Sequence, residues 1–213
     1  MRIKSWQLFV LMALLILLGR WCLNYPVSVA SGPSLVLGEE PRQEELSLPN
    51  SKLLNRQSEI SRLKLTHRFE ISGEAVAVTS YRWSFKNPYY DVDLGLAWGP
   101  RIKHYKDQLK FYQGARWLMW SYQESLEPAA LQDIQSHIGN IHLIPAEGHP
   151  NLEKAIHWIH VGDPVRVRGF LVEIFGPSGE LIAASSTRRD DSGDGACEIV
   201  WVEELQIGKK IYR

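Results

Sequence analysis

The loop at 190–195 has the residue spacing that comes closest to a known chemical motif. Asp190, Ser192 and Asp194 alternate along it and Gly195 stands sixth, which matches the opening of a calcium-binding loop with oxygen ligands. Position twelve is Trp201, where such a loop needs a bidentate glutamate, and the flanking segments are typical of strands. The pattern therefore favours a polar turn whose aspartates cap backbone amides over a calcium site.

Other polar residues surround this loop. A pair between Arg189 and Asp191 would fix its shape, which is a structural role. Glu198 falls ninth from Asp190, another position at which calcium loops supply a ligand. We therefore keep Arg189, Asp191, Asp194 and Glu198 as candidate binding residues.

The histidines are unevenly placed, with five of the seven clustered in one stretch of the chain. His157 and His160 are three positions apart, a spacing that can present two imidazoles to one metal on a helix. No third ligand stands at a diagnostic spacing, and Gly162 follows almost directly. The sequence therefore names no metal, and we predict no cofactor. The clustered histidines are His137, His142, His149, His157 and His160.

Cys197 is a candidate nucleophile, with His142 as its base. Such chemistry needs a nucleophile, a base and a third group that orients the base. The third group is not visible in the sequence, and Cys197 opens an apolar strand that contains Ile199 and Trp201. This context favours a buried, inert thiol. The other cysteine, Cys22, is at the edge of the apolar N-terminal segment, so we expect no disulfide.

The composition is that of a globular protein. The chain has 213 residues, 45% of them hydrophobic and 23% charged, which suits one domain plus a targeting segment. The formal net charge is zero. Nucleic-acid-binding proteins normally carry a basic excess, so no nucleic-acid partner is expected.

The N-terminus indicates a membrane-targeting segment. Arg2 and Lys4 precede the uncharged run at 8–19, and the whole segment spans 1–23. This pattern predicts a transmembrane anchor or a cleaved signal, with the N-terminus cytoplasmic and the rest exported. In a Gram-negative bacterium the exported part would be periplasmic, and the expected partners are the membrane and another envelope protein.

The remainder divides into a linker and a folded domain. Prolines punctuate the segment 24–65, which is predicted to be a tether with a short helix at 51–65. The domain is predicted to occupy 66–213, with helices at 107–124, 128–137 and 151–159. Its predicted strands are 68–83, 91–98, 138–146, 164–176, 181–186 and 197–205.

This order of elements predicts an α+β fold that is mostly β. A long bent first strand, a second strand, a helix and three later strands suit a small closed or half-open barrel. The run at 162–169 is how many such barrels begin a central strand. The architecture resembles an OB-type barrel. An antiparallel sheet flanked by two or three helices is the competing interpretation.

The C-terminal third carries a more specific resemblance. Its pieces are Gly162-Asp163-x-Val165, Gly169-Phe170-Leu171-Val172 and Ser185-Ser186-x-x-Arg189-x-Asp191-x-Gly193-x-Gly195-Ala196-Cys197-Glu198, preceded by the stretch 140–146. With these pieces, residues 138–205 resemble uncharacterised bacterial membrane-associated proteins. The resemblance implies a shared domain and brings no activity with it.

Three functions stay open. The leading hypothesis is a non-catalytic binding or accessory module of the cell envelope, tethered to the membrane. The alternative is a metal-dependent or cysteine-based enzyme centred on His142, Asp191, Asp194 and Glu198. An OB-type nucleic-acid binder is the third. The candidate binding residues are His142, Arg189, Asp191, Asp194 and Glu198.

Overall fold

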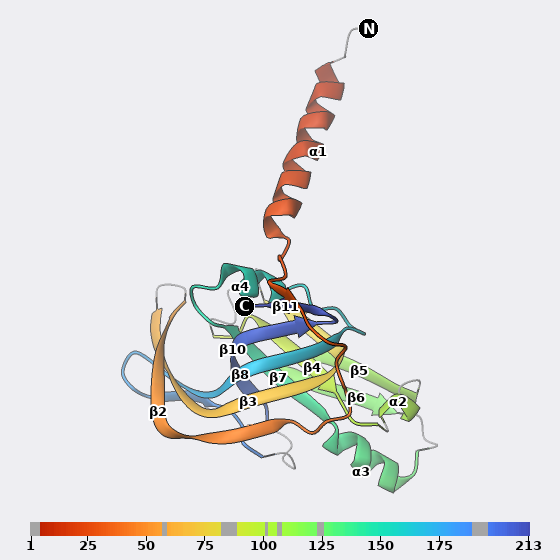
Figure 1. Ribbon diagram of the computed structural model, residues 1–213, viewed down its shortest axis with the longest axis vertical. Helices are drawn as coiled ribbons and strands as arrows, with labels where there is room; N and C mark the ends of the chain where they lie inside the picture. The colour runs from red at the N-terminus through yellow and green to blue at the C-terminus, as the bar shows by residue number, and fades with distance from the viewer. Residues whose placement is uncertain are drawn as a thin grey trace.

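A large mixed β-sheet makes up most of the molecule (Figure 1). The computed structural model describes residues 5–56, 59–81, 89–100, 102–105, 108–122, 126–188 and 196–213. The prediction of a mostly β fold with a few helices is confirmed. The sheet is mixed because β7 and β10 run parallel, whereas the other strand pairs in it are antiparallel.

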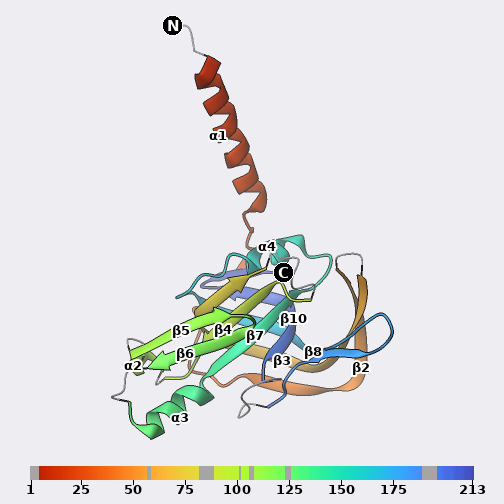
Figure 2. The same cartoon turned by 180° about the vertical axis from the view of Figure 1, so that it is seen from behind.

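Helix α1 (Ser5–Asn24) stands apart from the sheet (Figures 1 and 2). Across the described residues, neither α1 nor any other helix combines the length and the apolar character that crossing a membrane requires. This finding overturns the prediction of a transmembrane or signal-anchor segment at 1–23. The predicted single-pass topology, with an exported or periplasmic C-terminal domain, is wrong for the same reason.

Five strands form the centre of the fold, each hydrogen-bonded to the next. β3 pairs with β4, β4 with β7, β7 with β10, and β10 with β8, which pairs again with β3. Alternating apolar residues form the strands and turn one face of each inward, as Val92, Leu94 and Leu96 of β4 do. The bounds are β3 Glu59–Ser80, β4 Val92–Ala97, β7 Ile138–Pro145, β8 Pro164–Phe175 and β10 Glu198–Ile207.

The sheet as a whole is not a closed barrel, so that prediction is wrong. β3 and β8 continue past the central strands, where β2 (Arg42–Arg56) pairs with β3 and β9 (Leu181–Ala184) pairs with β8. β1 (Ala30–Ser31) and β11 (Lys210–Tyr212) extend the sheet beyond β10. These additions give the sheet free edges, which a closed barrel does not have.

Two of the predicted helices are confirmed and one end of the core depends on them. α3 (Pro128–Ser136) begins with a proline, which suits the first turn of a helix. α4 (Pro150–Ile156) buries Leu152, Ala155 and Ile156 against the core. The short α2 (Ile102–Tyr105) precedes β5.

The predicted helix at 107–124 is wrong, because this stretch forms a two-stranded hairpin. β5 (Leu109–Gly114) and β6 (Trp117–Tyr122) pair with each other in a separate sheet. Aromatic residues favour strands, and here they face one another across the hairpin, as Phe111 and Trp120 do. Figure 2 shows the hairpin in front of β4 and β7, which it covers.

The predicted helix at 51–65 is also wrong. Residues 42–56 lie in β2 and residues 59–80 in β3, and the two strands pair along most of their length. Leu63 and Leu65 are both buried, two positions apart, which is the period of a strand. The sequence spacing of Leu53, Ile60 and Leu63 had suggested a helical face instead.

Candidate functional site

A buried pair of polar side chains lies beneath the β5–β6 hairpin. Asp93 of β4 and His142 of β7 are opposite each other in the strand register, and His142 Nδ1 lies 2.6 Å from Asp93 Oδ1. Asp93 has no exposed surface and His142 is 5% exposed. Val92 and Leu94, the neighbours of Asp93 along β4, face the core. Because side chains alternate between the two faces of a strand, Asp93 points to the outer face, which the hairpin covers.

Both oxygens of the Asp93 carboxylate are engaged. The Tyr81 hydroxyl donates a hydrogen bond to Asp93 Oδ2 at 2.6 Å. Burial and this bond raise the pKa of Tyr81, so the hydroxyl keeps its proton and acts as a donor. The Asp93 carboxylate thus fixes the orientation of the His142 ring. Carboxylates orient catalytic and metal-binding histidines in the same way.

Cys197 approaches the same imidazole from the start of β10. It comes directly before β10, which runs parallel to β7 so that Ile199 is opposite His142. Cys197 is a free, half-buried thiol, and it lies close enough to His142 to raise the pKa of that imidazole. Because Nδ1 of His142 is bonded to Asp93, Nε2 is the nitrogen left for a contact with the sulfur. The cysteine, the histidine and the aspartate therefore form a continuous chain of contacts.

The charge state of His142 follows from these contacts. Burial lowers the pKa of His142, but the hydrogen bonds to Asp93 and Cys197 outweigh it and raise the pKa to about 9. The ring is therefore an imidazolium at neutral pH and donates from both nitrogens. Tyr90 covers it, with the two rings stacked at 4.6 Å between centroids. Burial also raises the pKa of Tyr90, to about 12.

Asn140 and Gln113 surround the thiol. Asn140 Nδ2 lies 3.1 Å from Cys197 Sγ and donates to the Arg116 carbonyl oxygen at 2.7 Å. Gln113 Nε2 donates to Asn140 Oδ1 at 2.9 Å, while Gln113 Oε1 is buried without a hydrogen-bond partner in the described part of the chain. Asn140 therefore connects the sulfur to the Arg116 carbonyl and to Gln113.

The structure brings together only part of the predicted site. His142 lies in the cluster, whereas Glu198 is buried on the opposite side of β10, near Trp98 and Gly139. Arg189, Asp191 and Asp194 lie outside the described residues. Within the described residues, the histidine, cysteine and acidic side chains form no group of three or more that could hold a metal ion.

Sequence reasoning missed Asp93 and Asn140. Asp93 lies on the side of an alternating strand opposite Val92 and Leu94, and nothing in the local sequence marks it as buried. The hairpin that buries it was predicted to be a helix. Asn140 had been read as part of the apolar stretch 138–146. The pairing of Cys197 with His142 was predicted as a possibility, but its orienting group was not.

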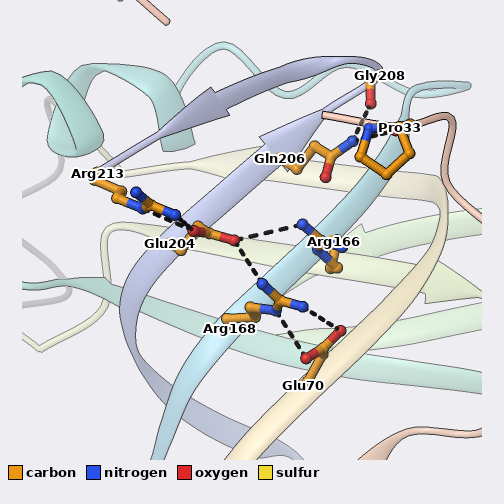
Figure 3. Close-up of polar contacts among 8 residues, drawn as sticks. All are labelled: Pro33, Glu70, Arg166, Arg168, Glu204, Gln206, Gly208 and Arg213. Carbon is orange, nitrogen blue, oxygen red and sulfur yellow. Dashed lines mark hydrogen bonds and ion pairs between the residues drawn. The ribbon is translucent and has the colours of Figure 1, made fainter. Parts of the chain in front are cut away.

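A second feature is a polar groove between β2 and the outer face of β3, β8 and β10. Its volume is about 860 Å³. Arg168 holds Glu70 with two hydrogen bonds, at 2.7 and 3.2 Å, and also reaches Glu204 (Figure 3). Arg166 and Arg213 complete the ion pairs of Glu204. Arg166 and Arg168 are therefore both paired with acids.

Comparison with known protein families, with curated proteins and with solved structures gives no match. The chemistry of the side chains therefore has to carry the functional argument. The Asp93–His142–Cys197 cluster and the polar groove are the two features of the described residues that can support one.

Proposed function

We propose that this protein is a cysteine-dependent enzyme that cleaves an acyl bond. Cys197 is the nucleophile, His142 the acid and base, and Asp93 the residue that orients His142. One observation carries the proposal: His142 is hydrogen-bonded to a buried carboxylate, and a free, half-buried thiol lies close enough to raise the pKa of the same imidazole. This is the set of roles that nucleophilic catalysis by cysteine requires.

The charges suit the chemistry. The thiolate is the reactive form of a catalytic cysteine, and the imidazolium of His142 is the proton donor of the site. The thiolate bonds to the carbonyl carbon of the substrate, and the leaving group departs with the proton of His142 Nε2. A water molecule then loses a proton to His142 and attacks the thioester. The carboxylic acid leaves, and the thiolate and imidazolium are restored.

The side chains around the thiol suit an amide substrate. Asn140 Nδ2 is 3.1 Å from the sulfur, and the N–H directed at the sulfur can be redirected to the oxygen that becomes negative when the carbonyl is attacked, while the other N–H stays bonded to Arg116. Gln113 Oε1, which has no hydrogen-bond partner among the described residues, can accept from the N–H of an amide. An amide offers both groups side by side, whereas an ester lacks the N–H.

The test is the alkylation of Cys197 by iodoacetamide, followed by mass spectrometry of the full-length chain. A Cys22→Ser background leaves one thiol. We expect His142→Gln to slow alkylation about tenfold or more, because the thiolate loses its cationic partner. The control is His160→Gln, since His160 is exposed and lies outside the cluster. Equal rates in His142→Gln and the parent would reject the enzyme proposal.

A structural role for the same cluster makes a different prediction. If the three side chains only stabilise the fold, removing the thiol costs stability and the thiol itself is unreactive. We expect Cys197→Ser to fold with nearly the parent free energy of unfolding, since the hydroxyl also accepts from Asn140 and His142. The parent thiol should react faster with iodoacetamide than free cysteine at the same pH.

The groove supports a second proposal, a binding function. Its volume lies in the range of ligand sites, and it presents both signs of charge, with Arg68 and Lys52 beside Glu44 and Glu203. An extended peptide that carries both charges fits such a surface better than a polyanion does. We propose this accessory role as the alternative to the enzyme.

Labelled peptides test the groove directly. A decapeptide of alternating lysine and glutamate should bind, and Arg68→Gln should weaken its binding, whereas Lys154→Gln on α4 should not. A single-stranded oligonucleotide is the third probe. Tighter binding of the oligonucleotide would favour a nucleic-acid binder, and no binding of either would reject the groove.

We also propose that the central strands are of the OB type. The support is the order in which β3, β4, β7, β10 and β8 pair, which returns to β3. OB folds are five-stranded and partly open. The fold by itself assigns no activity.

A further inference from the structure

The turn of the β5–β6 hairpin has an unfavourable backbone conformation. Gly114 and Trp117 are paired, and the two residues between them, Ala115 and Arg116, have φ angles of 49° and 71°. Hairpin turns of this length favour asparagine and glycine, which adopt positive φ at little cost. Two residues with side chains cost free energy in this conformation, so surrounding contacts must hold the turn.

The contact that holds the turn comes from the cysteine site. Asn140 Nδ2 donates to the Arg116 carbonyl oxygen at 2.7 Å and is 3.1 Å from Cys197 Sγ. A single amide nitrogen therefore joins the strained turn to the thiol. Gln113, near the end of β5, donates a hydrogen bond to Oδ1 of Asn140 and so orients the same amide.

The Arg116 side chain lies over the site as well. Its guanidinium carbon is 5.2 Å from the centroid of the Tyr90 ring, which also stacks on the His142 ring at 4.6 Å. Arg116 is half-exposed, and no carboxylate of the described residues forms an ion pair with it. Its charge nevertheless acts on the site, since it opposes the rise in the pKa of Tyr81 and Tyr90.

We propose that Arg116 selects acyl substrates that carry a carboxylate next to the bond that is cleaved. This inference rests on the proposed cysteine chemistry. A guanidinium binds a carboxylate through two parallel hydrogen bonds, and its stacking on Tyr90 fixes the plane in which they point. Because Asp93 is already bonded to His142 and Tyr81, the substrate supplies the anion.

Two alkylating probes of nearly equal size separate the effect of the probe's charge from the reactivity of the Cys197 thiol. Iodoacetate is an anion and iodoacetamide is its neutral amide, and both form the same thioether bond to Cys197 Sγ with the loss of iodide. In the full-length Cys22→Ser chain, we expect iodoacetate to react faster than iodoacetamide at low salt. Added salt should reduce this preference, because it screens the half-exposed charge.

Three variants assign the preference to Arg116. We expect Arg116→Gln to slow iodoacetate about tenfold and to change the iodoacetamide rate less than about twofold, as the loss of one charged contact predicts. Arg116→Lys should keep part of the preference, since it keeps the charge without the planar fork. Lys110→Gln, which removes an exposed charge from the same hairpin, is the control and should behave as the parent.

The outcomes separate the two proposals. An unchanged ratio of the two rates in Arg116→Gln, with His142→Gln still slowing iodoacetamide, overturns the role of Arg116 alone. An iodoacetamide rate that does not depend on His142 overturns the cysteine chemistry. Circular dichroism spectra and urea unfolding of each variant show whether a change in rate reflects unfolding. If Arg116→Gln does not fold, Arg116→Lys provides the ratio.

Discussion

Leu118 of β6 packs directly onto Gly95 of β4, and this contact places the hairpin over the polar cluster. A Cβ atom added to Gly95 would lie 2.7 Å from Leu118 Cδ1, which is closer than two carbon atoms approach. Gly95 is two positions from Asp93 on the same face of β4. The hairpin therefore approaches closely enough to bury Asp93 because residue 95 has no side chain.

Gly95→Ala should therefore destabilise the protein. We expect a loss of about 1–3 kcal/mol in the free energy of unfolding, the usual cost of an added methyl group in a packed site. Urea unfolding followed by tryptophan fluorescence measures it. Gly38→Ala is the control, since nothing lies within 4 Å of an added Cβ there. An equal effect of both substitutions would contradict the packing argument.

His142 gives the stability a characteristic pH dependence. Its pKa is about 9 in the folded protein, against about 6.5 for an ordinary histidine. A raised pKa contributes stability that is complete below pH 6.5 and is lost as the pH rises through 9. At about 1.4 kcal/mol per pH unit, the contribution is on the order of 3 kcal/mol. The free energy of unfolding should fall over this interval.

His142→Gln should flatten this part of the pH profile. Urea unfolding at several pH values between 6 and 9.5 tests it, with His160→Gln as the matched control. His160 is an exposed histidine, so its loss should leave the slope unchanged. If the parent is equally stable at pH 6.5 and 9.5, the ring is not held as an imidazolium.

Strands with a regular apolar alternation could be predicted from the sequence. Val92, Leu94 and Leu96 share one face of β4, and all three are fully buried. The same local signal exists at 164–176 and 197–205, which became β8 and β10. In these segments the side chains that face the core also set the local pattern, so a short window contains the necessary information.

The hairpin at 109–122 could not be predicted in this way. Leu109, Leu118 and Tyr122 also fit one face of a helix, and the turn residues Ala115 and Arg116 are poor turn formers. What decides for strands is the contact of Leu118 with Gly95 and of Asn140 with the turn, both distant in the chain. Tertiary contacts overrode the local propensity.

The reactive residue types of the candidate site could be predicted from the sequence, but their arrangement in space could not. Cys197 and His142 are residue types that react, and their pairing could be considered from the sequence. Asp93 could not be chosen over other aspartates, because its register opposite His142 exists only once β4 and β7 pair. The other candidate residues, Arg189, Asp191 and Asp194, lie outside the described residues.

The Asp93 carboxylate can be tested without removing its hydrogen bonds. In Asp93→Asn the amide keeps a similar shape but carries no charge, and it can present an N–H to Nδ1 of His142. The imidazolium then loses its main anionic partner. We expect iodoacetamide alkylation of Cys197 to slow about tenfold or more, as the wrong tautomer of the base becomes favoured. Stopped-flow or quench kinetics followed by mass spectrometry gives the rate.

The control for this variant is Tyr81→Phe. It removes the hydrogen bond to the second oxygen of Asp93 and leaves the bond to His142 in place. We expect a change in alkylation rate of less than about threefold, since a single neutral hydrogen bond contributes modestly. Equal slowing by both substitutions would mean that Asp93 acts through the packing of Tyr81, and an unaffected Asp93→Asn would remove Asp93 from the mechanism.

Glu204 should stabilise the floor of the groove in a pH-dependent way. Burial raises the pKa of Glu204, but Arg213, with Arg168 and Arg166, outweighs it and lowers the pKa. A lowered pKa contributes stability that is present above the ordinary value of 4.5 and is lost as the pH falls. Glu204→Gln removes the charge that three arginines share, and only a tenth of the Glu204 side chain is exposed.

We therefore expect Glu204→Gln to cost about 2–4 kcal/mol at pH 7, chiefly because it leaves the largely buried Arg166 without its acidic partner. The cost should shrink as the pH falls below 4.5, where the parent carboxylate also takes up a proton. Glu173→Gln is the matched control, since Glu173 pairs with Lys64 in a more exposed position and should cost less than about 1 kcal/mol. Urea unfolding at pH 7 and pH 4 compares the two. Equal losses in the free energy of unfolding for both variants at pH 7 would show that water stabilises the arginines around Glu204 without the help of its charge.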